Sequence, residues 1–126
     1  MRKTDHKTRL RNEILETLQR FSSREFQEEV WAGYNLDFCI NSGEMYSILF
    51  DDIDIEEVDL RTLGFDHMQV MVIRQMAEII KNYFDQQPWD KSDIKILEDP
   101  LWQENRKKLN HLYVKTFGLN FKSHYS

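Results

Sequence analysis

The sequence predicts a mainly α-helical protein that folds as a single-domain compact bundle over residues 1–126. Apolar side chains recur every three to four residues in several stretches, which is the spacing of one face of an α-helix. A helix-start pattern, in which Ser, Asn or Asp precedes Glu or Gln by three residues between apolar neighbours, occurs four times. The chain has only four glycines and two prolines, and its length is that of one ordinary domain.

The first helix is expected over about residues 5–21, and residues 1–4 are expected to be flexible. One face of this helix is charged. The other face is formed by four apolar residues at helical spacing, Leu10, Ile14, Leu18 and Phe21.

A second helix is expected from about residue 23. Ser22 and Glu25 match a capping box, in which the side chain of each residue bonds to the backbone of the other, and the flanking phenylalanines match a hydrophobic staple. We expect Gly33 to end this helix.

Residues 34–50 fit two different structures. Asn41 and Glu44 match another capping box, which predicts a short helix after Asn41. The same stretch also fits a small β-hairpin around an Asn-Ser-Gly-Glu turn, because apolar residues alternate before the turn at Tyr34, Leu36, Phe38 and Ile40. The protein is mainly helical under either interpretation.

Two further matches predict a short turn after Asp54 and a long helix, residues 67–86, after Asp66. Pro88 should stop the long helix, and Trp89 beside it is the tryptophan most expected to be an exposed contact. The long helix has apolar residues on more than one face, so we expect it to be central and buried. Its methionines, which we assign to the core rather than to an adaptable groove, are Met68, Met71 and Met76.

The last helix is expected to open at Asp99 and Pro100, a favoured N-cap and N1 pair, and to close at Gly118. The basic run 106–108 should lie on its exposed face. Its inner face should consist of Trp102, Leu109, Leu112, Tyr113 and Phe117.

Charge is unevenly distributed along the chain. The sequence has 17 basic and 22 acidic residues, a net charge of −5, whereas residues 2–11 are strongly basic. Six of the acidic residues fall within residues 51–59, and six like charges at such close range repel one another unless a cationic partner reduces the repulsion. We therefore predict a partner-binding surface at the cluster of six carboxylates: Asp51, Asp52, Asp54, Glu56, Glu57 and Asp59. The competing interpretation of this cluster is a solvated acidic loop and helix start.

The sequence contains no motif that specifies an enzyme, so we predict no catalytic residue, no metal site and no cofactor. One alternative is a small metal-dependent enzyme with Asp52 and Asp54 as ligands, although the acidic segment lacks the glycine of a calcium loop and the alternating strands and helices of a phosphotransferase. A second alternative is a regulatory adaptor that binds nucleic acid through residues 2–11. The acidic pI of about 5.3 makes nucleic acid an unlikely partner.

Cys39 is the single cysteine, which excludes an internal disulfide and fits a reducing compartment. No apolar run is long enough to cross a membrane or to form the core of an export signal. We therefore expect a cytoplasmic protein without a membrane partner; its oligomeric state is left open.

Four segments resemble small bacterial immunity proteins that protect a cell from contact-dependent inhibition and other polymorphic toxins. These are Trp31 at the end of an early helix, Leu49-Phe50-Asp51-Asp52, Leu63-Gly64-Phe65, and the stretch from Ile96 to Trp102. The resemblance spans roughly residues 25–117. It implies a non-catalytic protein that binds and neutralises a cognate toxin, often a nuclease, and the acidic cluster predicts that this toxin has a basic surface.

Overall fold

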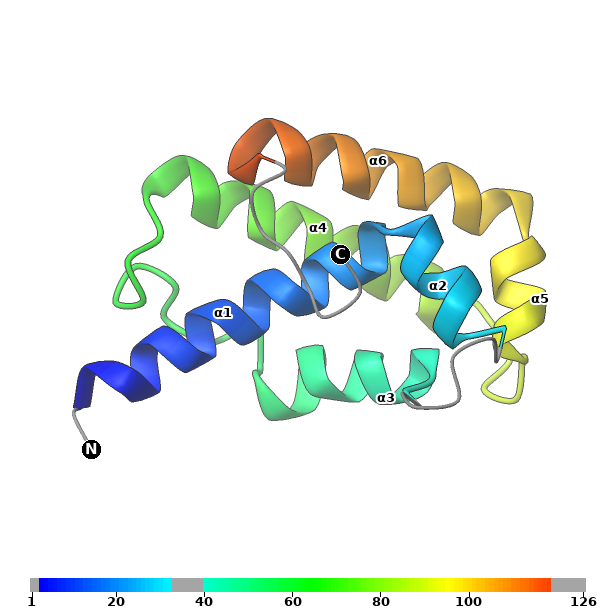
Figure 1. Ribbon diagram of the computed structural model, residues 1–126, viewed down its shortest axis with the longest axis horizontal. Coiled ribbons are helices and arrows are strands. Elements are labelled where there is room, and N and C mark those ends of the chain that lie inside the picture. Colours follow the sequence, from blue (N-terminus) through cyan, green and yellow to red (C-terminus); the bar gives the residue numbers. More distant parts are fainter. Residues whose placement is uncertain (1–2, 33–39, 119–126) are drawn as a thin grey trace.

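The computed structural model describes residues 3–32 and 40–118, and within them it contains six α-helices and no strand. The helices are α1 (Lys3–Ser22), α2 (Arg24–Val30), α3 (Ser42–Ser47), α4 (His67–Asp85), α5 (Asp93–Glu98) and α6 (Pro100–Phe117), with a π-helical turn, η1 (Ile48–Asp52), directly after α3. The long helix α6 packs against both α1 and α4, and α3 with η1 runs along the opposite side of α1 (Figure 1). The predicted mainly helical fold is confirmed.

The core is organised around Trp102 of α6, whose side chain is completely buried against the other two long helices. The ring of Trp102 meets Tyr83 and Phe84 of α4 at centroid distances of 5.0 and 5.4 Å, and it meets Phe21 of α1 at 6.3 Å. Edge-to-face and tilted aromatic contacts at these distances add to the free energy of burying the rings. One residue of α6 thus ties three helices together.

Gln27 of α2 is a buried polar residue that joins the same helices by hydrogen bonds. Its Nε2 donates to the carbonyl oxygens of Arg20 and Phe21 at 3.0 and 2.9 Å, and its Oε1 accepts from Trp102 Nε1 at 2.9 Å. The last carbonyls of a helix have no partner within that helix, so the Gln27 amide supplies one for the end of α1. Gln27 thereby fixes α2 against α1 and α6.

The hairpin proposed for residues 34–50 is wrong for its second half, because α3 and η1 make residues 42–52 helical. Both reciprocal bonds of the capping box between Asn41 and Glu44 are present. Met45 and Leu49, four residues apart, are both buried, which matches the spacing of a helix rather than a strand. Residues 34–39, the first half of the proposed hairpin, lie outside the described residues.

The predicted starts of α4 and α6 are confirmed, whereas α1 begins at Lys3, inside the segment expected to be flexible, and the start of α5 was not predicted. Asp66 and Gln69 form the predicted capping box, and Asp99 caps α6 with Pro100 in its first turn. At α2 the cap is Ser23, which accepts from Phe26 N, whereas the Ser22 hydroxyl donates to Leu18 O. The helix ends at Val30, and Gly33 lies outside the described residues.

Two predictions of burial are also wrong. Met76 lies in the core as expected, but Met68 and Met71 near the start of α4 are exposed. Arg106, predicted on the surface of α6, is buried and donates to Ser22 O at 3.2 Å. Tertiary packing decides both cases, since helical spacing alone cannot say how much of a helix its neighbours cover.

No helix in the described part of the chain is long and apolar enough to span a membrane.

Candidate functional site: an acidic face

The six predicted carboxylates all lie on the surface, in η1 and in the loop that follows it. Apolar residues in the same segment point into the protein: Ile53, Ile55 and Leu60 are buried members of the core. Burial of these three side chains leaves the neighbouring carboxylates on the outside. The structure thus brings the predicted acidic residues together in one exposed segment.

The backbone of this loop is held by Arg74 of α4. The guanidinium donates from Nη1 to Ile55 O, and from Nη2 to Val58 O at 2.9 Å. The amide of Ile55 also donates to Leu49 O at 3.0 Å, and Glu57 and Val58 close the predicted turn by donating to Asp54 O. Asp54 adopts a left-handed conformation with φ of 57°, which aspartate tolerates better than most residues. The acidic loop, defined as residues 51–59, therefore has a fixed backbone.

The cation held against this loop, Arg74, binds the loop's backbone and not its carboxylates. In the described part of the chain, none of the six carboxylates of the acidic loop forms an ion pair. The guanidinium of Arg74 donates to backbone carbonyl oxygens instead. The sequence from Glu25 to Leu60 contains no lysine or arginine at all. The described part of that stretch includes α3 and η1, so the helix leading into the acidic loop also carries no positive charge.

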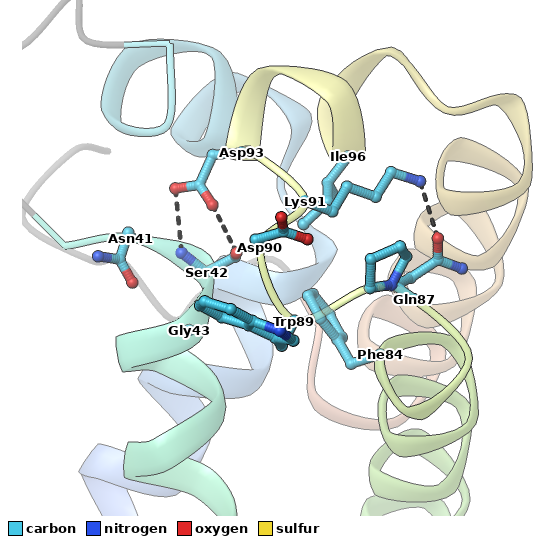
Figure 2. Close-up of a pocket in the computed structure, with 11 residues that line it drawn as sticks. Asn41, Ser42, Gly43, Phe84, Gln87, Trp89, Asp90, Lys91, Asp93 and Ile96 are labelled. Carbon is cyan, nitrogen blue, oxygen red and sulfur yellow. Dashed lines mark hydrogen bonds between the residues drawn. The ribbon is translucent and has the colours of Figure 1, made fainter.

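A hollow of about 320 Å³ lies at the other end of α3, where the loop between α4 and α5 meets the start of α3 (Figure 2). Its lining includes the apolar side chains of Phe84, Pro88 and Ile96 and the carboxylates of Asp90 and Asp93. Trp89 stands at this hollow with 96% of its surface exposed, whereas Trp31 and Trp102 are buried. The prediction that Trp89 is the exposed tryptophan is confirmed.

Two polar networks hold the walls of the hollow. Asp93, in the first turn of α5, accepts from Ser42 N at 3.1 Å and from Ser42 Oγ at 2.5 Å, and so connects α5 to α3 (Figure 2). Lys91 Nζ donates to Asp99 Oδ2 and to Gln87 Oε1, both at 2.9 Å. The charge of Lys91 is therefore already matched within the protein.

Asp99 is the centre of the second network. It accepts a hydrogen bond of 2.6 Å from the Tyr83 hydroxyl in addition to the bond from Lys91. Burial opposes ionisation of Asp99, but hydrogen bonds from Tyr83 and Lys91 outweigh burial and hold its pKa below the ordinary value. Burial and the bond to Asp99 raise the pKa of Tyr83. At neutral pH the pair is a carboxylate and a neutral phenol, which is a stable structural arrangement.

The sequence pointed to Trp89 but not to the hollow beside it. Asp90 and Asp93 were missed because their importance depends on α3, which is distant in the sequence. A local signal was present: Ser92 precedes Asp93 and caps α5 by accepting from Lys95 N at 3.3 Å, so a helix start could have been placed there.

Two observations concern the residues named for the alternative functions. Among the described residues, no three His, Cys, Asp or Glu side chains are grouped so that they could hold a metal ion, and Asp52 and Asp54 belong to no such group. In the basic N-terminal segment, Arg11 donates to Leu63 O and lies 4.2 Å from the centre of the Phe65 ring. Arg11 is thus engaged in packing the end of the bundle. Cys39 lies outside the described residues.

A third feature is a groove of about 420 Å³ between α4 and α6. Ile79 and Leu112 line it, together with Lys107, Lys108 and His111. Glu104 also lines it, so its charge is mixed, in contrast to the acidic loop.

Comparison of the chain with family models, with curated proteins and with solved structures finds no match. The function proposed below therefore rests on the residues and on their geometry.

Proposed function

We propose that this protein is a non-catalytic inhibitor that binds a basic protein through the acidic loop, as an immunity protein binds its cognate toxin. The observation that carries this proposal is the display of six exposed carboxylates on a loop whose backbone is fixed by Arg74 and by buried isoleucines. A toxin that acts on nucleic acid would offer a matching basic surface, because such an enzyme must hold phosphates.

Two physical arguments support this use of the loop. A loop that is already ordered loses little conformational entropy on binding, so more of the contact energy appears as affinity. A concentration of one sign of charge attracts an oppositely charged protein over about 10 Å at moderate ionic strength and farther at low salt, which raises the association rate and selects among partners.

The first experiment identifies the partner from its gene. We expect a toxin or toxin fragment encoded beside the gene for this protein. Co-expression of the two in a sensitive cell should restore growth, and the purified pair should form a complex. A neighbouring toxin that kills equally well with and without this protein would contradict the proposal.

The second experiment tests the surface. The variant Asp51→Asn/Asp52→Asn/Asp54→Asn should slow association with that toxin about tenfold at low salt, with a smaller dependence on salt and little change in dissociation. Stopped-flow measurements over a range of salt concentrations give these rates. The matched control removes three exposed charges elsewhere, Glu13→Gln/Glu78→Gln/Glu104→Gln. Equal effects of the two variants would show that net charge matters and that the acidic loop does not.

A further inference from the structure

We propose that the hollow beside Trp89 is a binding site for a guanidinium group, and that an arginine side chain of the basic partner occupies it. This inference rests on the proposed function, since it adds a second contact for the same partner. Its starting point is the exposure of Trp89. An indole that is 96% exposed makes almost no contact within the described part of the chain, so it contributes little to the fold. Tryptophan is also the residue type most enriched among side chains that dominate protein interfaces.

The lining of the hollow selects a cation. Asp90 is exposed and forms no hydrogen bond or ion pair in the described part of the protein. Asp93 accepts one bond on each carboxylate oxygen from Ser42 and can accept more, because each oxygen has two lone pairs. The one basic residue in the lining, Lys91, is neutralised by Asp99. The hollow therefore presents two carboxylates and the exposed indole of Trp89 to a ligand.

This combination favours arginine over lysine. A guanidinium group is planar, so it can stack on an indole ring while its edge donates to a carboxylate. A lysine ammonium has no plane to stack and is more strongly hydrated. The hollow is large enough for the end of one arginine side chain, and its apolar residues can cover the aliphatic part of that side chain.

The same partner can reach the hollow and the acidic loop. Ser42 borders the hollow, and the helical run from Ser42 through η1 ends at Asp52, within the acidic loop (Figures 1 and 2). At about 1.5 Å per residue, this run spans about 15 Å. An interface of ordinary size, with about 800 Å² on each partner, covers such a distance.

Fluorescence provides the test, because Trp89 is the only exposed tryptophan of the three. The probe is a hexa-arginine peptide, titrated into the full-length protein. We expect a saturable change in tryptophan emission that is absent from Trp89→Phe, which assigns the change to Trp89. Hexa-lysine should bind more weakly, and hexa-glutamate should produce no change. An identical response of Trp89→Phe, or equal affinities for the arginine and lysine peptides, would overturn the proposal.

The charge requirement is tested with Asp90→Asn, which leaves the link between Asp93 and Ser42 intact. Loss of one exposed charge pair should weaken hexa-arginine binding about two- to fivefold. Unchanged affinity would overturn the assignment. The acidic-loop variant Asp51→Asn/Asp52→Asn/Asp54→Asn must keep the Trp89 response, because otherwise the peptide is held by the loop alone.

These results separate the two proposals. If the hollow has no arginine site, Trp89 will not respond to the peptide, yet salt-dependent association with the toxin will persist. If the acidic loop is not the contact surface, the toxin will associate at the same rate with its variant, whatever Trp89 does.

Discussion

The single side-chain amide of Gln27 links α2 to both α1 and α6 by three buried hydrogen bonds. The substitution Gln27→Leu keeps a buried side chain of similar size and removes all three bonds. Arg20 O retains a second hydrogen bond, from Ser23 N at 3.3 Å, so this carbonyl is not left without a partner. Trp102 Nε1 and Phe21 O lose their partners in a completely buried site.

The cost follows from these two orphaned groups. A buried donor or acceptor without a partner costs about 1–3 kcal/mol. Two of them should reduce the free energy of unfolding by about 3 kcal/mol, since the added apolar surface of leucine offsets part of the loss. For a domain of this size, that corresponds to a fall in Tm of about 12 °C.

The assay is urea and thermal unfolding followed by circular dichroism, with the exposed substitution Gln75→Leu as the control. A double-mutant cycle with Trp102→Phe isolates the bond between the two side chains, because the phenylalanine has no N–H to leave unpaired. A loss below about 1 kcal/mol for Gln27→Leu would refute the reasoning, since it would mean that water or a shifted backbone satisfies the same groups.

Three other substitutions test separate parts of the structure. Arg74→Met should loosen the acidic loop, so amide hydrogen exchange should accelerate at residues 55–58 while the rest of α4 stays protected; unchanged exchange would contradict the anchoring role. Tyr113→Phe should leave stability unchanged or raise it by up to about 1 kcal/mol in urea unfolding, because the buried hydroxyl has no partner in the described part of the protein, and a clear loss would reveal one. Asp99→Asn keeps a capping side chain but removes the charge. The folded-state pKa of Asp99 is lowered, so its contribution is complete above the ordinary value of 3.8 and is lost as pH falls through the folded-state pKa. The variant should therefore be less stable at pH 7 and show a flatter stability profile below pH 4.

Helix starts were predictable because their signals are local. The capping boxes at Asn41 and Asp66 each depend on residues three apart, and both form as expected. At α2 the same rule selected Ser22 although Ser23 is the cap. Two adjacent serines offer nearly equivalent caps, and the choice depends on α1, whose last turn takes the Ser22 hydroxyl as a donor to Leu18 O.

The alternation before residue 41 suggested the first strand of a hairpin, and a hairpin needs a second strand to pair with it. Residues 45–50 would have supplied that strand, and they are helical because Met45 and Leu49 bury one helical face. For Arg106, a local charge pattern wrongly predicted exposure. Its basic neighbours made it look like part of a solvated face, yet Ser22 O at the end of α1 gives its guanidinium a buried acceptor that only the tertiary structure supplies.

The acidic loop could be predicted from a local sequence pattern, whereas the hollow depends on tertiary contacts. The six carboxylates lie within one short segment and were visible in the sequence as a charge cluster, and the burial of Ile53 and Ile55 between them explains their exposure. The hollow requires the start of α3 to meet the loop after α4, and Asp93 makes that junction by bonding to Ser42. A binding face composed of both parts would thus combine a charge pattern visible in the sequence with an aromatic site created by the fold. The net charge of −5 understates the negative potential at the acidic loop, because the chain has no lysine or arginine between Glu25 and Leu60, the stretch that contains α3, η1 and this loop.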